Sequence, residues 1–201
     1  MQTSAIILAA GRSRRMGEPK LALAHQGATV LEVVLRTLGR PGVQQRVVVL
    51  GHHRDRLEPL ALLAGRDGPP VVIAVNPDPE GDMASSVRIG VGAACVGADW
   101  FLITPADLPA LRPGSVDRLL AEAERCLGLK RPPIVVPACK GRTGHPLAVP
   151  AALRADVLAA APGWTLRDWV YGDAYPVREV EVDDEGIFRD LDVPADRQIL
   201  E

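Results

Sequence analysis

Small residues and a glycine follow directly after the first apolar run of the chain. Residues 5–8 are continuously apolar, which is typical of a buried strand in a parallel sheet. Ala9, Ala10 and Gly11 come next, and their small size lets a ligand approach the backbone closely. Gly11 also tolerates positive φ, so successive N–H groups there can turn toward an anion. These residues indicate an anion site at the end of the first strand.

The same loop carries a high density of positive charge. Within nine positions it holds four basic residues, Arg12, Arg14, Arg15 and Lys20. A turn between a strand and a helix does not need this charge, whereas a bound polyphosphate does; a solvated surface turn is the alternative. The glycines fit neither the G-x-G-x-x-G dinucleotide loop nor the Walker loop G-x-x-x-x-G-K-[ST]. We therefore expect a third kind of phosphate-binding loop.

Length and composition indicate one domain with an aliphatic core. The 201 residues suit a single domain over 1–201, with 47% hydrophobic and only 3% aromatic residues. The net charge of −2 argues against a general nucleic-acid binder, because such binding depends on an extended basic surface. The positive charge of this chain is local instead.

No segment has the roughly 18 to 20 apolar residues of a membrane span, and the first residues lack the layout of a signal peptide. We therefore expect a cytoplasmic protein with no membrane contact. Cys95, Cys126 and Cys139 are odd in number and lack metal-binding spacing, so we expect them to be reduced and mostly buried.

Strand and helix patterns alternate along the chain. Thr29 predicts the cap of a helix over 30–38, because its apolar residues share one face. Strands are expected at 46–50, 71–75, 100–103, 134–137 and 175–182, and helices at 53–64, 113–127, 151–160 and 166–170. This alternation predicts an α/β fold: a single-domain Rossmann-like, doubly wound, mostly parallel sheet flanked by helices.

An acidic residue ends the strand at 100–103. Asp107 lies where an open α/β sheet places its ligand, and Pro105 and Pro109 stiffen the backbone around it. A buried carboxylate is costly unless it is paired or bound to a cation. Asp107 is therefore a candidate metal ligand; an ordinary aspartate turn between prolines is the alternative.

Two other polar stretches have a functional and a structural interpretation. Asn76, Ser85 and Ser86 lie in and after a polar loop that enters a helix, with Asp82 as its candidate cap, and plain capping explains any one of them. His52 and His53 follow a strand, but adjacent side chains point in different directions. We therefore expect ordinary residues there and no metal site.

Two further loops lie late in the chain. Glycines flank Arg142 and His145, which favours a mobile, cationic loop that closes on a second substrate, with a surface hairpin as the alternative. Asp190, Asp192 and Asp196 form an acidic turn before a short helix, and such turns are commonly solvated and capping.

The loop motif resembles a known signature. Leu8-Ala9-Ala10-Gly11-x-Ser13-x-Arg15-Met16-Gly17-x-x-Lys20 is similar to that of the sugar-nucleotide and molybdopterin nucleotidyltransferase superfamily. Ala-Ala-Gly with serine at this spacing most resembles the molybdenum cofactor cytidylyltransferase branch. Gly144-His145-Pro146 also resembles that branch more than the guanylyltransferase branch, and the likeness spans nearly the whole chain.

The resemblance implies roles for individual residues. It implies catalytic roles for Arg15, Lys20 and Asp107, Mg²⁺ on Asp107 and on Asp192 in preference to Asp190, and acceptor contacts from Arg142, Gly144 and His145. It implies nucleotide contacts from Leu8, Ala9, Ala10, Gly11, Arg12, Ser13, Lys20, Asn76, Ser85, Ser86 and Asp107. The family's Gly-Met-Ser-Ser-Ser stretch is altered here, because Asp82 is inserted after Gly81 and Ala84 replaces a serine.

The implied reaction moves CMP from CTP onto the terminal phosphate of molybdenum-loaded molybdopterin and releases pyrophosphate, without a covalent nucleophile. Alternatives are GTP with the same pterin, a sugar phosphate as acceptor, or a non-catalytic carrier that delivers the cofactor. The implied protein partners are a target molybdoenzyme or an accessory protein. A pure carrier needs no metal-bridged triphosphate site, so Lys20, Asp107 and Asp192 together argue for an enzyme.

Overall fold

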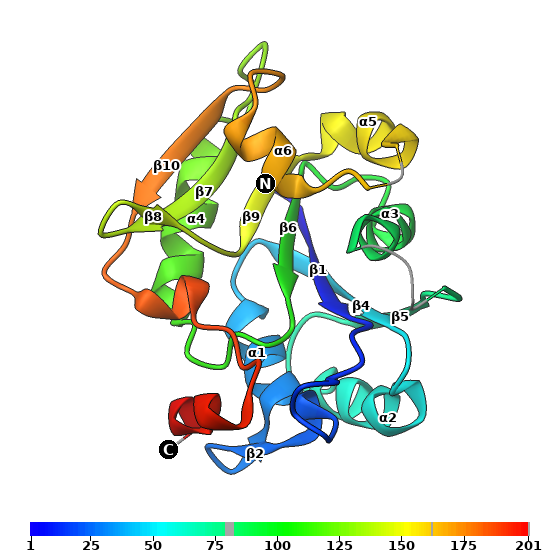
Figure 1. Cartoon of the computed structure of the whole chain (residues 1–201). Helices are drawn as coiled ribbons and strands as arrows, with labels where there is room; N and C mark the ends of the chain where they lie inside the picture. The colour runs from blue at the N-terminus through cyan, green and yellow to red at the C-terminus, as the bar shows by residue number, and fades with distance from the viewer. Residues whose placement is uncertain (79–82, 162, 201) are drawn as a thin grey trace.

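The computed structural model describes residues 1–78, 83–161 and 163–200. Within these residues, eight strands join one sheet in the order β10-β7-β9-β6-β1-β4-β5, with β8 paired to β7 (Figure 1). The bounds of its strands are β1 Thr3–Ala9, β4 Val43–Leu50, β5 Val71–Val75, β6 Trp100–Pro105, β7 Ile134–Cys139, β8 Arg142–Thr143, β9 Leu147–Pro150 and β10 Val177–Glu181. A separate hairpin contains β2 Ala24–His25 and β3 Ala28–Thr29.

The central strands run in parallel and bring their carboxyl ends to one edge. β1 pairs in parallel with β4 and with β6, so Ala9 lies opposite Leu50 and Leu8 lies opposite Pro105. The loops that follow these three strands therefore meet at the same edge of the sheet, which is where open α/β folds bind ligands.

Helices cover both faces of the sheet. One apolar cluster packs Ile7 of β1 against α1 Val30–Leu38, α2 Arg54–Ala64 and α4 Pro113–Arg125. The other packs Ile6 against α3 Met83–Ala93, α5 Arg154–Ala159 and α6 Leu166–Tyr171. Adjacent residues of β1 thus point to opposite faces, as a strand buried on both sides requires. The predicted doubly wound, mostly parallel α/β fold is confirmed.

Helix α1 begins where its sequence predicts. The hydroxyl of Thr29 accepts a hydrogen bond from the backbone N–H of Glu32, and the carboxylate of Glu32 accepts one from the N–H of Thr29. This reciprocal capping box satisfies two N–H groups that have no partner inside the helix. The same apolar face that predicted the helix is buried on the sheet.

Some elements differ from the expectations. β9 inserts between β6 and β7 and runs antiparallel to both, so the sheet is mixed at that side. The segment expected as a helix over 151–160 begins with a 3₁₀ turn, Ala151–Leu153, before α5. Gly81 and Asp82, with the expected helix cap, lie outside the described residues.

The chain end returns to the loop that follows β1. A 3₁₀ helix, Pro194–Leu200, places the carbonyl of Leu200 3.0 Å from His25 Nδ1, and Arg197 pairs with Glu18. Figure 1 shows this terminal segment beside β2. Among the described residues, no helix combines the length and the apolar character needed to cross a bilayer. Cys126 and Cys139 are buried as expected, whereas Cys95 is exposed.

Candidate active site

A cavity of about 250 Å³ opens at the carboxyl edge of the sheet. It brings together nine of the predicted nucleotide-site residues, and the rest of its wall comes from Leu21, Met83, Pro105 and Ala106. The nine are Leu8, Ala9, Ala10, Gly11, Ser13, Lys20, Asn76, Ser86 and Asp107. Their contacts with a nucleotide stay predictions.

The loop after β1 folds back on itself at Ser13. Ser13 adopts φ of 52°, which is uncommon for a residue other than glycine, and Gly17 has φ of 73°. The hydroxyl of Ser13 accepts a hydrogen bond from the backbone N–H of Lys20 at 3.2 Å, and its carbonyl accepts one from Met16 at 3.0 Å. These bonds set the start of the 3₁₀ turn Lys20–Ala22, which aims Lys20 at the cavity.

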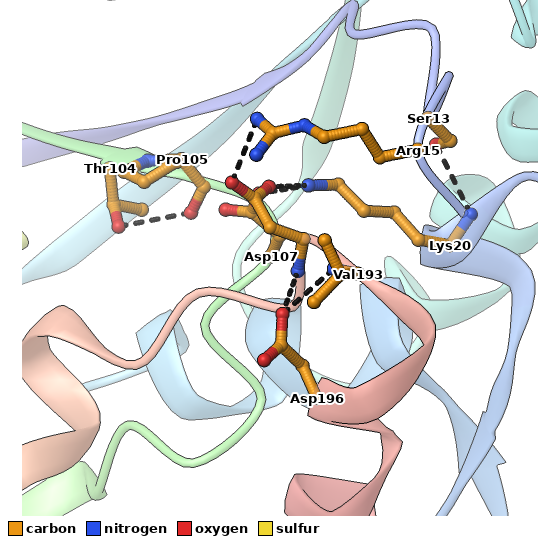
Figure 2. Close-up of polar contacts among 9 residues, drawn as sticks. Ser13, Arg15, Lys20, Thr104, Pro105, Asp107, Val193 and Asp196 are labelled. Carbon is orange, nitrogen blue, oxygen red and sulfur yellow. Dashed lines mark hydrogen bonds and ion pairs between the residues drawn. The ribbon is translucent and has the colours of Figure 1, made fainter.

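The ammonium group of Lys20 lies between two carboxylates from distant parts of the chain. Its Nζ is 2.5 Å from Asp107 Oδ2 and 2.8 Å from Asp192 Oδ1, and the Lys20 and Asp107 side chains are largely buried (Figure 2). Burial by itself lowers the pKa of Lys20, but the charges and hydrogen bonds of both aspartates outweigh it and leave the pKa raised. The hydrogen bond from Lys20 lowers the pKa of Asp192. The sequence prediction that these three residues act together is consistent with this geometry.

Arg15 and Arg12 lie at the border of the cavity. Arg15 Nη2 is 3.1 Å from Asp192 Oδ2 (Figure 2), but the Arg15 side chain is 70% exposed. Arg12 points to the turn after β4 instead, where its Nε donates to His52 Nε2 at 2.5 Å. Neither arginine lines the cavity as described, in contrast to Lys20.

Asn76 organises the other wall. Its side-chain amide donates to the hydroxyls of Ser85 and Ser86, at 2.9 and 3.0 Å, while its carbonyl oxygen accepts from the N–H of Asp78. The predicted serines are therefore tied to the end of β5 through Asn76. Ser86 lines the cavity as described, whereas Ser85 is not among its lining residues.

Backbone hydrogen bonds fix the position of Asp107. The N–H of Ala106 donates to the carbonyl of Leu8 at 3.1 Å, and the N–H of Leu191 donates to the carbonyl of Asp107 at 3.0 Å. The segment is thereby held between β1 and the C-terminal turn. Asp107 Oδ1 is buried and has no hydrogen-bond partner among the described residues.

This unpartnered oxygen fits a cation ligand. Among the residues described, no group of three or more His, Cys, Asp or Glu side chains is arranged to hold a metal ion. Mg²⁺ in nucleotide enzymes, however, commonly takes one or two carboxylates and completes its shell with phosphate oxygens and water. Asp107 and Asp192 supply such a pair, and their role as metal ligands stays a prediction.

The acidic turn near the chain end has a structural part and a charged part. Asp196 accepts the backbone N–H groups of Asp192 and Val193, both at 2.8 Å, and so fixes the turn that carries Asp192 (Figure 2). Asp190 faces a different environment, because burial and the charges of Asp107 and Asp192 raise its pKa to about 6. Of the two candidates, Asp192 is the one bonded to Lys20.

A second cavity, of about 450 Å³, adjoins the first, because Leu8 and Met83 line both. It contains all three predicted acceptor residues, Arg142, Gly144 and His145. Of the rest of its wall, the sequence did not identify Thr165, Arg167, Tyr171 and Phe188, and it named Asp190 only as a candidate metal ligand.

Cations stack on aromatic rings in this second cavity. The Arg142 guanidinium lies 4.1 Å from the centre of the Phe188 ring, and that of Arg167 lies 5.2 Å from Tyr171. The hydroxyl of Tyr171 is 2.5 Å from that of Thr143 and joins α6 to β8. The sequence predicts a helix over 166–170, but which of its residues face the cavity depends on this tertiary contact.

The segment around His145 is a hairpin and not an irregular loop. β8 pairs antiparallel with β7, and the N–H of His145 donates to the carbonyl of Ile187 at 2.7 Å. Burial lowers the pKa of His145, so its ring is neutral at pH 7, and its Nδ1 has no partner among the described residues. The backbone is thus the hairpin that the sequence offered as the alternative, while the contact of Arg142 and His145 with an acceptor stays a prediction.

Similar proteins are nucleotidyltransferases. A probable molybdenum cofactor guanylyltransferase of Bacillus cereus is 34% identical over 106 residues, covering 52% of this chain and 48% of that protein. A 2-C-methyl-D-erythritol 4-phosphate cytidylyltransferase of Aeromonas hydrophila is 34% identical over 128 residues, covering 62% of this chain and 49% of that protein. The chain thus matches about half the length of these curated relatives.

Solved structures share the whole fold. Rv0371c from Mycobacterium tuberculosis H37Rv has a TM-score of 0.82 at 25% identity and covers 100% of this chain and 98% of its own. A nucleotidyl transferase from Methanothermobacter thermautotroptrophicus has a TM-score of 0.78 at 27% identity, covering 98% of this chain and 94% of its own. The family model of the MobA-like NTP transferase domain matches residues 5–175. This match covers most of the chain and includes part of the lining of both cavities. This protein therefore belongs to the MobA-like NTP transferase family.

Proposed function

We propose that this domain transfers a nucleoside monophosphate, CMP from CTP, onto the terminal phosphate of molybdenum-loaded molybdopterin and releases pyrophosphate. The observation that carries the proposal is the position of Lys20 between Asp107 and Asp192 at a cavity that shares Leu8 and Met83 with a second cavity. A two-substrate transfer needs two neighbouring binding sites and a charged centre between them.

The first cavity suits a triphosphate. Its floor is the small-residue loop after β1, and Lys20 supplies a cation with three donors, two of which already serve the carboxylates. Mg²⁺ held by Asp107 and Asp192 would neutralise charge on the phosphate oxygens and stabilise the leaving pyrophosphate.

The second cavity suits an anionic acceptor with a flat ring system. Arg142 and Arg167 bring positive charge, and their aromatic partners Phe188 and Tyr171 offer flat apolar surface. The terminal phosphate of such an acceptor is mostly ionised at pH 7, since its second pKa is about 6. The attacking oxygen therefore needs no general base, and the neutral His145 is proposed to contact the acceptor only.

Charge grows at the α-phosphorus and on the leaving group during the transfer. Lys20 lies where it can stabilise this charge. Arg15 contacts the same Asp192 carboxylate as Lys20 does, from the solvent side. Removing one such donor typically costs about 3 kcal/mol in the barrier.

CTP is proposed because the Ala9-Ala10-Gly11 loop and the Gly144-His145-Pro146 unit resemble the cytidylyltransferase branch. GTP is the second candidate, since the similar Bacillus cereus protein is named as a guanylyltransferase. The reaction is proposed to take place in the cytoplasm, before the product passes to a molybdoenzyme or an accessory protein.

The test is release of pyrophosphate with Mg²⁺, molybdenum-loaded molybdopterin and CTP, GTP, ATP or UTP in separate reactions. Turnover that requires both Mg²⁺ and the pterin, and that is fastest with CTP, is expected. Faster turnover with GTP would support the proposed transfer reaction but would replace CTP by GTP as the nucleotide substrate. Tight pterin binding without release from any nucleotide would favour a carrier, and no pterin binding would point to another acceptor.

A further inference from the structure

The turn between β4 and α2 lies against the phosphate-binding loop. Because Leu50 at the end of β4 is opposite Ala9 at the end of β1, the residues that follow each strand are neighbours. His52 and His53 occupy this turn, and both contact Arg12. Neither histidine lines the two cavities of the candidate site as described, so any effect of the histidines on the cavities passes through the loop.

His53 holds one peptide unit of the loop. Its Nε2 is 3.0 Å from the carbonyl oxygen of Arg12, and a carbonyl only accepts, so the ring nitrogen donates. In a trans peptide the C=O and the following N–H point in opposite directions. Fixing the Arg12 carbonyl toward His53 therefore directs the N–H of Ser13 away from this turn.

Ser13 needs such support because its backbone is in a sparsely populated region. Its φ of 52° is disfavoured for a residue with a side chain, by about 1 kcal/mol or more. On its other side, the Ser13 hydroxyl and carbonyl accept from Lys20 and Met16. The loop is thus fixed on both sides of Ser13, a residue that lines the phosphate cavity.

His52 acts on the side chain of Arg12. Its Nε2 accepts from Arg12 Nε at 2.5 Å, which requires that this nitrogen carry a lone pair and that the ring proton be on Nδ1. Together the two histidines bind the carbonyl and the guanidinium of the same residue.

We propose that His52 and His53 are positioning residues that hold Arg12 and the Ser13 peptide in the conformation that binds the triphosphate. This inference rests on the proposed function, because it requires that the loop bind phosphates. Since the histidines act on the loop and do not contact the base, their loss is expected to weaken the binding of every polyphosphate by the same factor.

The test is equilibrium binding, by titration calorimetry in Mg²⁺, of CTP, GTP and inorganic tripolyphosphate. For each of these ligands that the unsubstituted protein binds, His53→Ala is expected to raise the Kd about tenfold, as for the loss of one hydrogen bond. His53→Gln restores a donor at similar reach and is expected to recover the Kd to within about threefold. His52→Gln, which restores an acceptor, is expected to recover binding relative to His52→Ala in the same way.

Arg54→Ala is the matched control, because Arg54 begins α2 next to His53 but pairs with Glu58. It is expected to leave all Kd values unchanged. Unchanged Kd values in folded His53→Ala, or a glutamine variant as weak as the alanine variant, would overturn the inference while the proposed function stands. Binding of tripolyphosphate but of no nucleotide, with the same losses in the variants, would support the inference and overturn the proposed function. Failure of the unsubstituted protein to bind any of the three would overturn both.

Discussion

Lys20 keeps two carboxylates close together that would otherwise repel each other. Asp107 and Asp192 are separated by 85 positions in the sequence, and each has an oxygen within 2.8 Å of the same ammonium group. Opposite charge at this distance, in a partly buried place, favours the ionised forms of Lys20 and Asp192. The three side chains are therefore held together before any substrate binds, so little reorganisation is needed when charge develops in the reaction.

Asp190 is expected to make the stability of the fold depend on pH. Its pKa of about 6 in the folded protein, against an ordinary value of 3.8, means that folding favours its protonated form. The stability that it contributes is fully present below about pH 4 and is lost as the pH rises through about 6. Asp190→Asn cannot ionise, so it is expected to become more stable relative to the unsubstituted protein between pH 5 and pH 8. Urea unfolding at both pH values checks this, and a difference in unfolding free energy that does not change with pH would contradict it.

At the scale of elements, one buried arginine joins three segments that surround the sheet. Arg46 of β4 is fully buried and donates to the carbonyls of Leu35, Ala64 and Pro69, which lie in the last turn of α1, at the end of α2 and shortly before β5. Burial lowers its pKa, yet the guanidinium stays charged at pH 7 and the carbonyls satisfy its donors. The turn that carries His52 and His53 follows this same strand.

Arg46→Met is expected to destabilise the protein by about 3 kcal/mol, because it leaves buried carbonyls without donors. Arg40→Met is the matched control: Arg40 pairs with Asp117 at a part-exposed site, where such a pair is worth about 1 kcal/mol or less. Unfolding in urea measures both. Equal losses of unfolding free energy in the two variants would contradict the role of Arg46 in holding these three segments together.

Gly144 sets the packing of the hairpin that carries the proposed acceptor residues Arg142 and His145. A Cβ at this position would lie only 2.3 Å from the backbone oxygen of Ile187, so a side chain there must displace one of the two segments. Gly144→Ala is expected to reduce kcat/KM for the acceptor by about tenfold, by moving Arg142 and His145, with less than about a twofold change in the Kd of the nucleotide. Gly114→Ala serves as the control, since nothing lies within 4 Å of its Cβ. Parallel loss of acceptor and nucleotide binding would contradict a local role.

At the scale of the whole molecule, the site is assembled from both ends of the chain. The loop after β1, the segment after β6 and the C-terminal turn meet at one edge of the sheet, and the C-terminal 3₁₀ helix packs beside the first hairpin (Figure 1). Binding at this edge is therefore expected to stabilise the entire fold. That residues 1–201 unfold as one unit stays a prediction.

A thermal unfolding scan tests both points. With Mg²⁺ and CTP at a hundred times its Kd, the free energy of unfolding is expected to rise by about 2.7 kcal/mol. For a chain of this size that corresponds to a rise in Tm of roughly 5 to 11 °C, in a single transition. Chelation of Mg²⁺ is expected to abolish the rise. Two transitions, or a rise that survives chelation, would contradict this.

The sequence predicted much of this arrangement because the relevant signals are local. The strand at 71–75 and the helix that Thr29 caps were predicted with the bounds observed. In the strand the apolar run marks these bounds, and in the helix the spacing of apolar residues and the capping residue mark them. That the loop after β1 and Asp107 line one cavity at this edge of the sheet also follows from local signals, because each comes shortly after a buried parallel strand. Local signals do not report which strands are neighbours, so the antiparallel insertion of β9 was missed.

The same limit explains contacts that the sequence did not predict. The hydrogen bonds of His52 and His53 with Arg12 could not be predicted, because they depend on the pairing of β1 with β4. Arg167 and Tyr171 belong to a short helix whose exposed side faces the second cavity only through its packing beside β8. Arg12 was expected at the nucleotide, but the described structure directs it to His52.

The most direct test of the central claim is the rate of Mg²⁺-dependent pyrophosphate release by Lys20→Ala and Asp107→Ala, with circular dichroism to verify folding. Asp117→Ala is the control, because Asp117 is a surface aspartate paired with Arg40. Each of the two variants is expected to lose at least about a hundredfold in turnover, while the control keeps the full rate. A folded Lys20→Ala or Asp107→Ala protein with near-normal turnover would contradict the assignment of this cluster as the reaction centre.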